Sequence, residues 1–282
     1  EKNSIQNEKI NGVSVYSYIE DENVISENKE ETHATFYSYS TIDKALKNDF
    51  KKSNNYLSLN GIWKFKWVKK PNDKPSNFFS NTYKTKNRDD IKVLANWEIE
   101  GFGIPIYANH QYEFAHYKYP ISKEMEYVDV KHPKNPGKVP HDYNPVGSYK
   151  RTFSIDKSWN NKEVFLHIGA MKSGGFVWIN GKYVGYSQGS KLPAEFNISN
   201  YLRKEKNTIA IQIYRWTDGS YLECQDFWRI SGIERDVYLY AQPKTRIKDL
   251  EISSLLDKTY KNGVLDVDVE FENHNNDDKE LT

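Results

Sequence analysis

Cysteine is almost missing from this chain: only one of its 282 residues, Cys224, carries a thiol. A single cysteine cannot form an intrachain disulfide, so the sequence gives no sign of an oxidising compartment. A lone thiol could act as a nucleophile, but a small buried apolar role is commoner for a free cysteine. Localisation therefore stays open between the cytoplasm and the periplasm.

An excess of one charge and long apolar runs are missing too. Forty Lys and Arg residues balance 39 Asp and Glu residues, which leaves a formal net charge of +1. A near-neutral chain lacks the electrostatic footprint of a nucleic-acid partner or of an acidic membrane surface. No apolar run approaches the ~20 residues that a membrane span needs. We therefore expect neither nucleic acid nor a membrane as a partner.

Several motifs that mark a particular chemistry are also absent. The chain has no G-x-S-x-G element, no glycine-rich phosphate loop and no H-E-x-x-H pair. His110 and His116 could bind a metal ion, but their spacing matches no standard zinc pattern and no cysteine lies near them. We therefore expect no metal site in this chain.

Short alternating segments are what the sequence does contain. "NGIWKFKWVKK" places Trp63, Phe65 and Trp67 on one face of a strand and lysines on the other. In "FVWINGKYVGYS", Asn180-Gly181 separates two such runs, which indicates a hairpin because both turn residues need a positive φ. Many short strands with turns between them predict an all-β fold, namely a jelly-roll β-sandwich.

The sequence divides into three parts. Residues 1–50 are polar with little periodicity, so we predict an extended arm with a short helix near "TIDKALKNDF". Residues 51–242 hold the jelly-roll domain. Residues 243–282 hold two alternating strands, which cannot bury a core alone. We interpret them as the first strands of a truncated immunoglobulin-like domain.

A charged and aromatic stretch, "YRWTDGSYLECQDFWRISGIERDVYLY", offers two carboxylates. Glycoside hydrolysis needs a pair ~5–9.5 Å apart, and Glu223 with Asp226 is a candidate. We favour the alternative, a lattice of ion pairs with nearby arginines such as Arg229, which would lock a structural corner. Trp216 and Trp228 would then lie in the core beneath it.

Six stretches between Tyr56 and Ile252 resemble glycoside hydrolase family 2, and within it the N-terminal domain of bacterial lac-type β-galactosidases. They occur in the family's order: "SLNGIWKFKW", "NWEIEGFGIPIYANHQYEF", "NPVGSYKRTFSI", "WINGKYVGYSQGSKLPAEFNISNYL", "NTIAIQIYRWTDGSYLECQDFWRISGIERDVYLY" and the segment from Pro243 to Asp249. The resemblance implies a jelly-roll domain, an immunoglobulin-like sandwich and then a TIM barrel. In the family, the barrel carries the catalytic glutamates, the magnesium ligands and most galactose contacts. The resemblance therefore implies that this chain contains no catalytic residue.

The resemblance also implies substrate-binding residues. One loop of the family's first domain reaches the galactose pocket, and its contact asparagine matches Asn109 in "IYANHQY". His110 stands beside it, where the family usually has an apolar residue. The family's sodium-binding aspartate matches Gly189 in "SQGSKLP", and glycine has no side-chain ligand. We therefore expect magnesium and sodium only in the full-length protein, with its sodium site absent or rebuilt.

The function that the resemblance implies is that of the N-terminal sugar-binding domain of a retaining β-galactosidase, which hydrolyses terminal non-reducing β-D-galactosides. Such a fragment would be inactive alone. Its partners would be the missing C-terminal domains with their barrel, the β-galactoside substrate and further copies in a homo-oligomer. A stand-alone carbohydrate-binding module and a family 2 glycosidase of another specificity stay open as alternatives.

Overall fold

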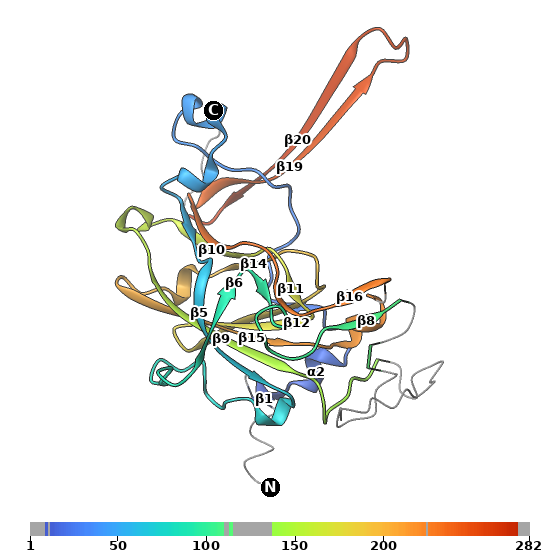
Figure 1. The fold of residues 1–282 in the computed structure, drawn as a ribbon. Coiled ribbons are helices and arrows are strands. Elements are labelled where there is room, and N and C mark those ends of the chain that lie inside the picture. The colour runs from blue at the N-terminus through green and yellow to red at the C-terminus, as the bar shows by residue number, and fades with distance from the viewer. Residues whose placement is uncertain (1–8, 11, 110–112, 115–136, 224, 276–282) are drawn as a thin grey trace.

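The computed structural model describes residues 9–10, 12–109, 113–114, 137–223 and 225–275, and most of their regular structure is β (Figure 1). Two antiparallel sheets pack against each other, and the residues between them form one apolar cluster. The predicted all-β sandwich is therefore confirmed.

The larger sheet has seven strands within the described part of the chain, and every hydrogen-bonded pair in it is antiparallel. In spatial order these strands are β3 (Ser26–Glu27), β13 (Lys182–Gln188), β12 (Gly174–Ile179), β15 (Lys206–Tyr214), β9 (Val146–Ser154), β5 (Gly61–Val68) and β6 (Asp89–Val93). Neighbours such as β15 and β9 are far apart in sequence, so the sheet is complete only when most of the chain is in place.

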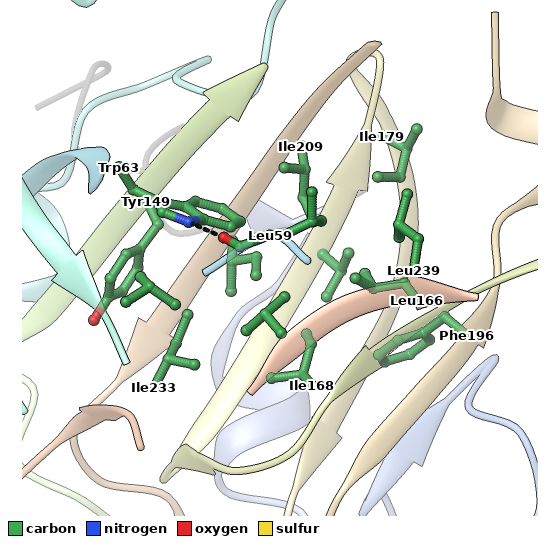
Figure 2. Packing of buried hydrophobic residues seen from close by; sticks show 14 of the residues in the cluster. Leu59, Trp63, Tyr149, Leu166, Ile168, Ile179, Phe196, Ile209, Ile233 and Leu239 are labelled. Carbon is green, nitrogen blue, oxygen red and sulfur yellow. Dashed lines mark hydrogen bonds between the residues drawn. The ribbon is translucent and has the colours of Figure 1, made fainter. Parts of the chain in front are cut away.

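The smaller sheet has four strands in the described residues: β14 (Ala194–Asn197), β10 (Glu163–Ile168), β18 (Val237–Gln242) and β4 (Tyr56–Ser58). Its inward side chains include Leu166, Ile168 and Leu239, which share the core with Trp63 and Ile209 of the larger sheet (Figure 2). Alternate residues of each strand face this core, as a period of two predicts. A further short sheet joins β11 (Met171–Lys172), β17 (Gly232–Ile233) and β7 (Ala95–Asn96).

The outer face of the larger sheet is buried as well. Phe176 and Trp178 of β12 form a second apolar cluster with Ile10, Val15 and Ile19 near the N-terminus. A sheet that is covered on both faces carries apolar residues at consecutive positions, which explains why every residue of β12 is buried. The covering residues belong to β1 (Lys9–Ile10), β2 (Val13–Ser14) and α2 (Tyr16–Ile19) and to the turns between them.

A second N-terminal segment, residues 28–50, crosses the outer face of the smaller sheet, and we call it the strap. Phe50 packs against the apolar cluster on that face, which contains Phe165 and Tyr238. Tyr37 stacks on Phe50, with the ring centroids 3.5 Å apart. The described part of the predicted extended arm is thus packed on both sheets, while the division of the chain at residue 50 stays a prediction.

Helices are short throughout the described residues. α3 (Ile42–Lys47) begins after Thr41, whose hydroxyl accepts a hydrogen bond from the Lys44 backbone N–H at 3.3 Å. This confirms the helix predicted in the arm. None of the described helices is long and apolar enough to cross a membrane. The 3₁₀ turns are η1 (Phe50–Lys52), η2 (Pro71–Asp73), η3 (Lys157–Trp159), η4 (Ser199–Tyr201) and η5 (Asp218–Tyr221).

The hairpin turn between β12 and β13 has the predicted geometry. Ile179 pairs with Lys182, so Asn180 and Gly181 form a two-residue turn. Their φ angles are 53° and 82°, both in the left-handed region that this turn needs. The predicted hairpin is therefore confirmed.

β19 (Thr245–Leu256) and β20 (Gly263–Asn273) form a two-stranded ribbon that projects from the sandwich (Figure 1). Within the described residues it pairs with no further strand, and Leu255, Leu265 and Phe271 are exposed on it. Two strands cannot bury a core alone. The immunoglobulin-like domain and its boundary at residue 243 stay predictions.

One carboxylate, that of Glu195, fastens the strap to the smaller sheet. It accepts hydrogen bonds from His33 Nε2 at 2.8 Å, His167 Nδ1 at 2.5 Å and the Tyr240 hydroxyl at 2.7 Å. Burial would raise the pKa of Glu195, but these hydrogen bonds outweigh it and lower the pKa to about 2. The bond to Glu195 raises the pKa of His33 to about 9.

We predict that this contact stabilises the fold most between about pH 4.5 and 6.5, the ordinary pKa values of the two groups. The contribution of His33 is complete below about pH 6.5 and is lost as the pH rises through about 9. The contribution of Glu195 is lost as the pH falls from about 4.5 toward 2.

Urea unfolding of the wild type and of His33→Ala, repeated across this pH range, measures the contribution of His33 to the free energy of unfolding. The variant should be less stable at about pH 6, and the difference should become smaller as the pH rises through about 9. An unchanged difference across this range would show that the contact does not titrate.

Candidate functional site

A short two-stranded ribbon positions Asn109, the predicted substrate-binding residue. β8 (Ile106–Ala108) pairs antiparallel with β16 (Phe227–Arg229), with Tyr107 opposite Trp228 and Ile106 opposite Arg229. Ile106 and Arg229 are only 5% and 2% exposed, whereas Tyr107 and Trp228 are 53% and 55% exposed. The ribbon therefore has a buried face and an outward face.

Asn109 and Asp226 extend the outward face by one residue on each strand. Asn109 follows β8 and Asp226 precedes β16, so the register places them opposite each other, and alternation puts them on the face of Tyr107 and Trp228. Both are exposed. The Tyr107 hydroxyl donates to Asp226 Oδ1, and the Tyr107 and Trp228 rings meet edge to face at 5.7 Å. One exposed surface thus presents an amide, a carboxylate, a phenol and an indole.

Of the two predicted substrate-binding residues, only Asn109 can be placed. It lies at the end of β8, where the buried face of the ribbon anchors it. His110 and His116 lie outside the described residues, as does Cys224. The roles of Asn109 and His110 stay predictions.

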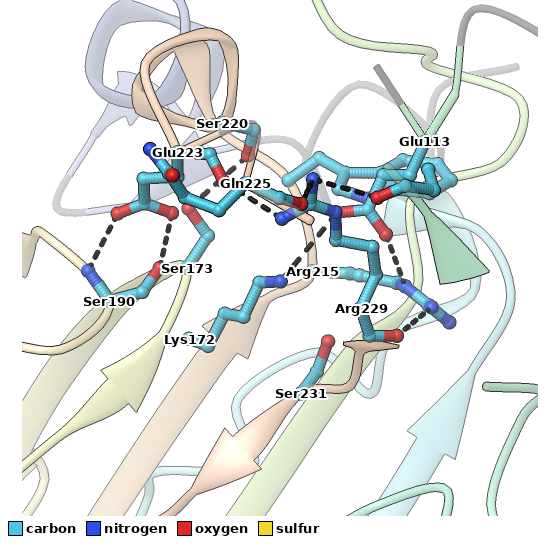
Figure 3. Close-up of polar contacts among 12 residues, drawn as sticks. Glu113, Lys172, Ser173, Ser190, Arg215, Ser220, Glu223, Gln225, Arg229 and Ser231 are labelled. Atoms are coloured by element: carbon cyan, nitrogen blue, oxygen red, sulfur yellow. Dashed lines mark hydrogen bonds and ion pairs between the residues drawn. The ribbon is translucent and has the colours of Figure 1, made fainter. Parts of the chain in front are cut away.

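Glu223 and Asp226 have separate tasks. Glu223 accepts hydrogen bonds from the backbone N–H of Ser190 at 2.8 Å and from its hydroxyl at 2.6 Å (Figure 3). It therefore anchors the turn that contains Gly189. Asp226 instead accepts from Tyr107 on the outward face of the ribbon. The structure gives the two carboxylates different partners, and only Asp226 borders Asn109.

Two arginines of the predicted lattice, Arg229 and Arg235, bind backbone carbonyls in the described residues. Arg229 donates to the carbonyl oxygen of Glu223 at 2.9 Å, to that of Ala108 at 3.3 Å and to that of Gln225. Arg235 donates to the carbonyl oxygen of Lys191 at 3.0 Å. A guanidinium has five N–H donors in a rigid fork, so one side chain can fix several loop carbonyls at once.

The predicted core position of Trp228 is wrong. Trp216 is 1% exposed and packs in the cluster on the outer face of the larger sheet, as predicted, but Trp228 is 55% exposed. The three residues of β16 alternate between the two faces of the ribbon, and Arg229 takes the buried side. Trp228 must therefore point outward.

A buried ionic network lies beneath the ribbon (Figure 3). Arg215 is ion-paired through Nη1 with Glu98 at 3.2 Å and through Nε with Glu113 at 3.5 Å, and it donates to the Arg229 carbonyl at 2.8 Å. Lys172 Nζ lies 3.7 Å from Glu113. Burial is the main cause that raises the pKa of Glu98 and lowers that of Lys172. No sequence pattern pointed to Glu98 or Glu113, because their partners lie far along the chain.

The backbone conformation at position 189 accounts for the glycine there. Its φ is +105°, in the region that favours glycine. A side chain at this position would be strained whatever ligand it offered. The sodium site expected for the full-length family therefore gains no side-chain ligand here, and its presence stays a prediction.

Glu163, Glu272 and His274 are the one group among the described residues whose donor atoms lie close enough, within 4.8 Å of one another, to hold a metal ion. They lie at the root of the β19–β20 ribbon. His274 Nδ1 is 2.6 Å from Glu163, and Arg246 pairs with Glu272. Arg246 and His274 already face the two carboxylates, so no metal ion is needed to offset the negative charge of the group.

Comparison with known proteins places the chain in a family. A sequence model described as "Glycosyl hydrolases family 2, sugar binding domain" matches residues 56–243. The chain belongs to glycosyl hydrolase family 2. The match covers every strand of the two sandwich sheets except β3, and the whole of the β8–β16 ribbon.

Two family 2 relatives are named beta-galactosidase. The protein of Priestia megaterium is 40% identical over 256 residues, which are 90% of this chain and 23% of the relative. That of Halalkalibacterium halodurans is 34% identical over 255 residues, 90% of this chain and 24% of the relative. The chain thus spans about a quarter of the length of the relatives that it matches.

Solved structures support the fold alone. A beta-glycosidase from Bacteroides vulgatus is 20% identical, with a TM-score of 0.55 over 79% of this chain and 25% of that one. A beta-glucuronidase from Ruminococcus gnavus is 18% identical, with a TM-score of 0.52 over 78% of this chain and 34% of that one. Both therefore support the β-sandwich fold of this chain.

Trp228 gives the ribbon face an optical reporter. It is exposed, whereas the other six tryptophans are buried or, in the case of Trp67, half-buried. We predict that iodide quenches the tryptophan fluorescence of the 282-residue chain mainly through Trp228. Trp228→Phe should remove most of the quenchable fraction, and Trp216→Phe should not. Equal quenching in the wild type and in Trp228→Phe would contradict the outward orientation.

Proposed function

We propose that this chain is the N-terminal sugar-binding part of a retaining β-galactosidase that hydrolyses terminal non-reducing β-D-galactosides such as lactose. The observation that carries the proposal is the position of Asn109 and Asp226 on one exposed face of a ribbon within a family 2 sugar-binding domain. The identity of 40% to a protein named beta-galactosidase supports this specificity over others in the family.

The chemistry of this face suits a sugar hydroxyl. The Asn109 amide can donate to one hydroxyl and accept from another, and the Asp226 carboxylate can only accept. Hydrogen bonds to a charged acceptor are the stronger kind. Together the two side chains can distinguish the orientation of neighbouring hydroxyls, which is how an axial hydroxyl is told from an equatorial one.

This part of the chain binds and does not catalyse. A retaining glycosidase needs two carboxyl groups ~5–5.5 Å apart, one to attack the anomeric carbon and one to protonate the leaving oxygen. Asp226 is the only carboxylate among the four outward-facing residues of the ribbon, and Glu223 is bound to Ser190. Neither described carboxylate of this region therefore has a partner for that reaction on the ribbon face, and we assign the reacting pair to the barrel of the full-length enzyme.

The remaining parts of the proposal concern the full-length protein. Its barrel would complete the pocket against the ribbon, and further copies would form a homo-oligomer. Magnesium and sodium would bind outside the residues discussed above. A stand-alone carbohydrate-binding module is the rival function, because the ribbon face is exposed without any barrel.

Hydrolysis of a chromogenic β-galactoside tests the proposal directly. The 282-residue chain and the longer gene product are assayed side by side. Activity of the longer form alone is the expected result, because we assign the reacting pair of carboxyl groups to the barrel. Activity of the short chain would contradict the proposal and would make Glu223 and Asp226 the first residues to mutate. Galactose binding by the short chain with an inactive longer form would favour the rival module.

Asn109→Ala in the longer form should lower kcat/KM for the same substrate by about tenfold or more, the effect of a lost hydrogen bond in the transition state. Asn54→Ala is the control, because Asn54 is exposed and lies outside the ribbon. Unchanged kinetics for Asn109→Ala would remove Asn109 from the pocket.

A further inference from the structure

The exposed rings of Tyr107 and Trp228 have no role in the function proposed so far. They share the outward face with Asn109 and Asp226 but lie one step further along the ribbon. Side chains on one face of a strand are two residues apart, which is roughly 7 Å. That offset lets a polar pair hold one sugar ring while an aromatic pair meets the next ring.

We propose that Trp228, supported by Tyr107, forms a platform for the second sugar ring of a β-galactoside, on the leaving-group side of the bond that is cut. The inference rests on the proposed function, because Asn109 and Asp226 must hold the galactose. It adds a determinant of leaving-group preference that lies in the sandwich.

The geometry supports a platform. Tyr107 meets Trp228 edge to face, with an angle of 63° between the rings, and an edge contact covers less of the indole than a stacked one would. The indole is 55% exposed although six other tryptophans are not. Arg229, on the buried side of the same strand, fixes the backbone from which Trp228 projects.

The chemistry around Trp228 also fits a sugar better than a protein partner. The centre of a protein–protein interface is depleted in charged residues. Here the aromatic pair adjoins an exposed carboxylate and an exposed amide. Sugar rings need this mixture, because their C–H faces are apolar and their hydroxyls form hydrogen bonds.

Steady-state kinetics of the longer gene product test the platform. Lactose has a second ring and methyl β-galactoside has none, so kcat/KM is measured for both. Trp228→Ala should lower kcat/KM for lactose by about tenfold, the loss typical of a buried aromatic anchor. The value for methyl β-galactoside should fall by less than about threefold. Trp228→Phe should restore most of the lactose value. Leu222→Ala, which removes a side chain that is 87% exposed on the neighbouring loop, is the control.

Two results would overturn the platform. Equal losses for both substrates together with a lower melting temperature would mean that Trp228 docks against the rest of the protein. No change for either substrate would mean that it contacts neither. A wild-type protein that cleaves neither galactoside would reject the proposed function instead, and this is seen before any variant is compared.

Discussion

The candidate site depends on the buried guanidinium of Arg229. This side chain is 2% exposed, and it ties the end of β8 to the loop before β16 through three backbone carbonyls. Burying a charge without partners is costly, and the hydrogen bonds to these carbonyls offset that cost. Arg215 supports the same point by donating to the Arg229 carbonyl while it is paired with Glu98 and Glu113. The hydrogen bonds of Arg229 and Arg215 beneath the ribbon thus hold Asn109 and Asp226 in register.

The rest of the sandwich supplies a rigid base for this arrangement. The larger sheet is covered on both faces, and the N-terminal segments also close the outer face of the smaller sheet. A loop carried by such a scaffold can hold binding groups precisely without a large core of its own. The same design leaves the outward face of the β8–β16 ribbon exposed.

Local pattern predicted most of this fold. The alternation around Trp63 and the Asn180-Gly181 turn depend on neighbouring residues alone, and both predictions are confirmed. The packing of residues 9–27 could not be predicted, because Ser26 and Glu27 pair with β13 and the apolar residues before them pack on β12, both more than 100 positions away. A sequence without strong periodicity does not indicate which sheet it will cover.

The candidate site was harder to predict than the fold. The outward position of Trp228 could not be predicted, because a three-residue strand alternates in the same way whichever face is buried, and only the burial of Arg229 decides it. The resemblance to family 2 pointed to Asn109. Asp226 beside it emerged from the strand register, because the two residues are 117 positions apart in sequence.

The central claim is that the outward face of the β8–β16 ribbon lies against the substrate. The most direct test is a structure of the longer gene product with a slowly reacting galactoside bound. The account predicts the Asn109 amide and the Asp226 carboxylate within hydrogen-bonding distance of galactose hydroxyls, with the Trp228 indole next to the leaving-group ring. A ligand bound elsewhere, or a ribbon face buried against protein, would contradict it.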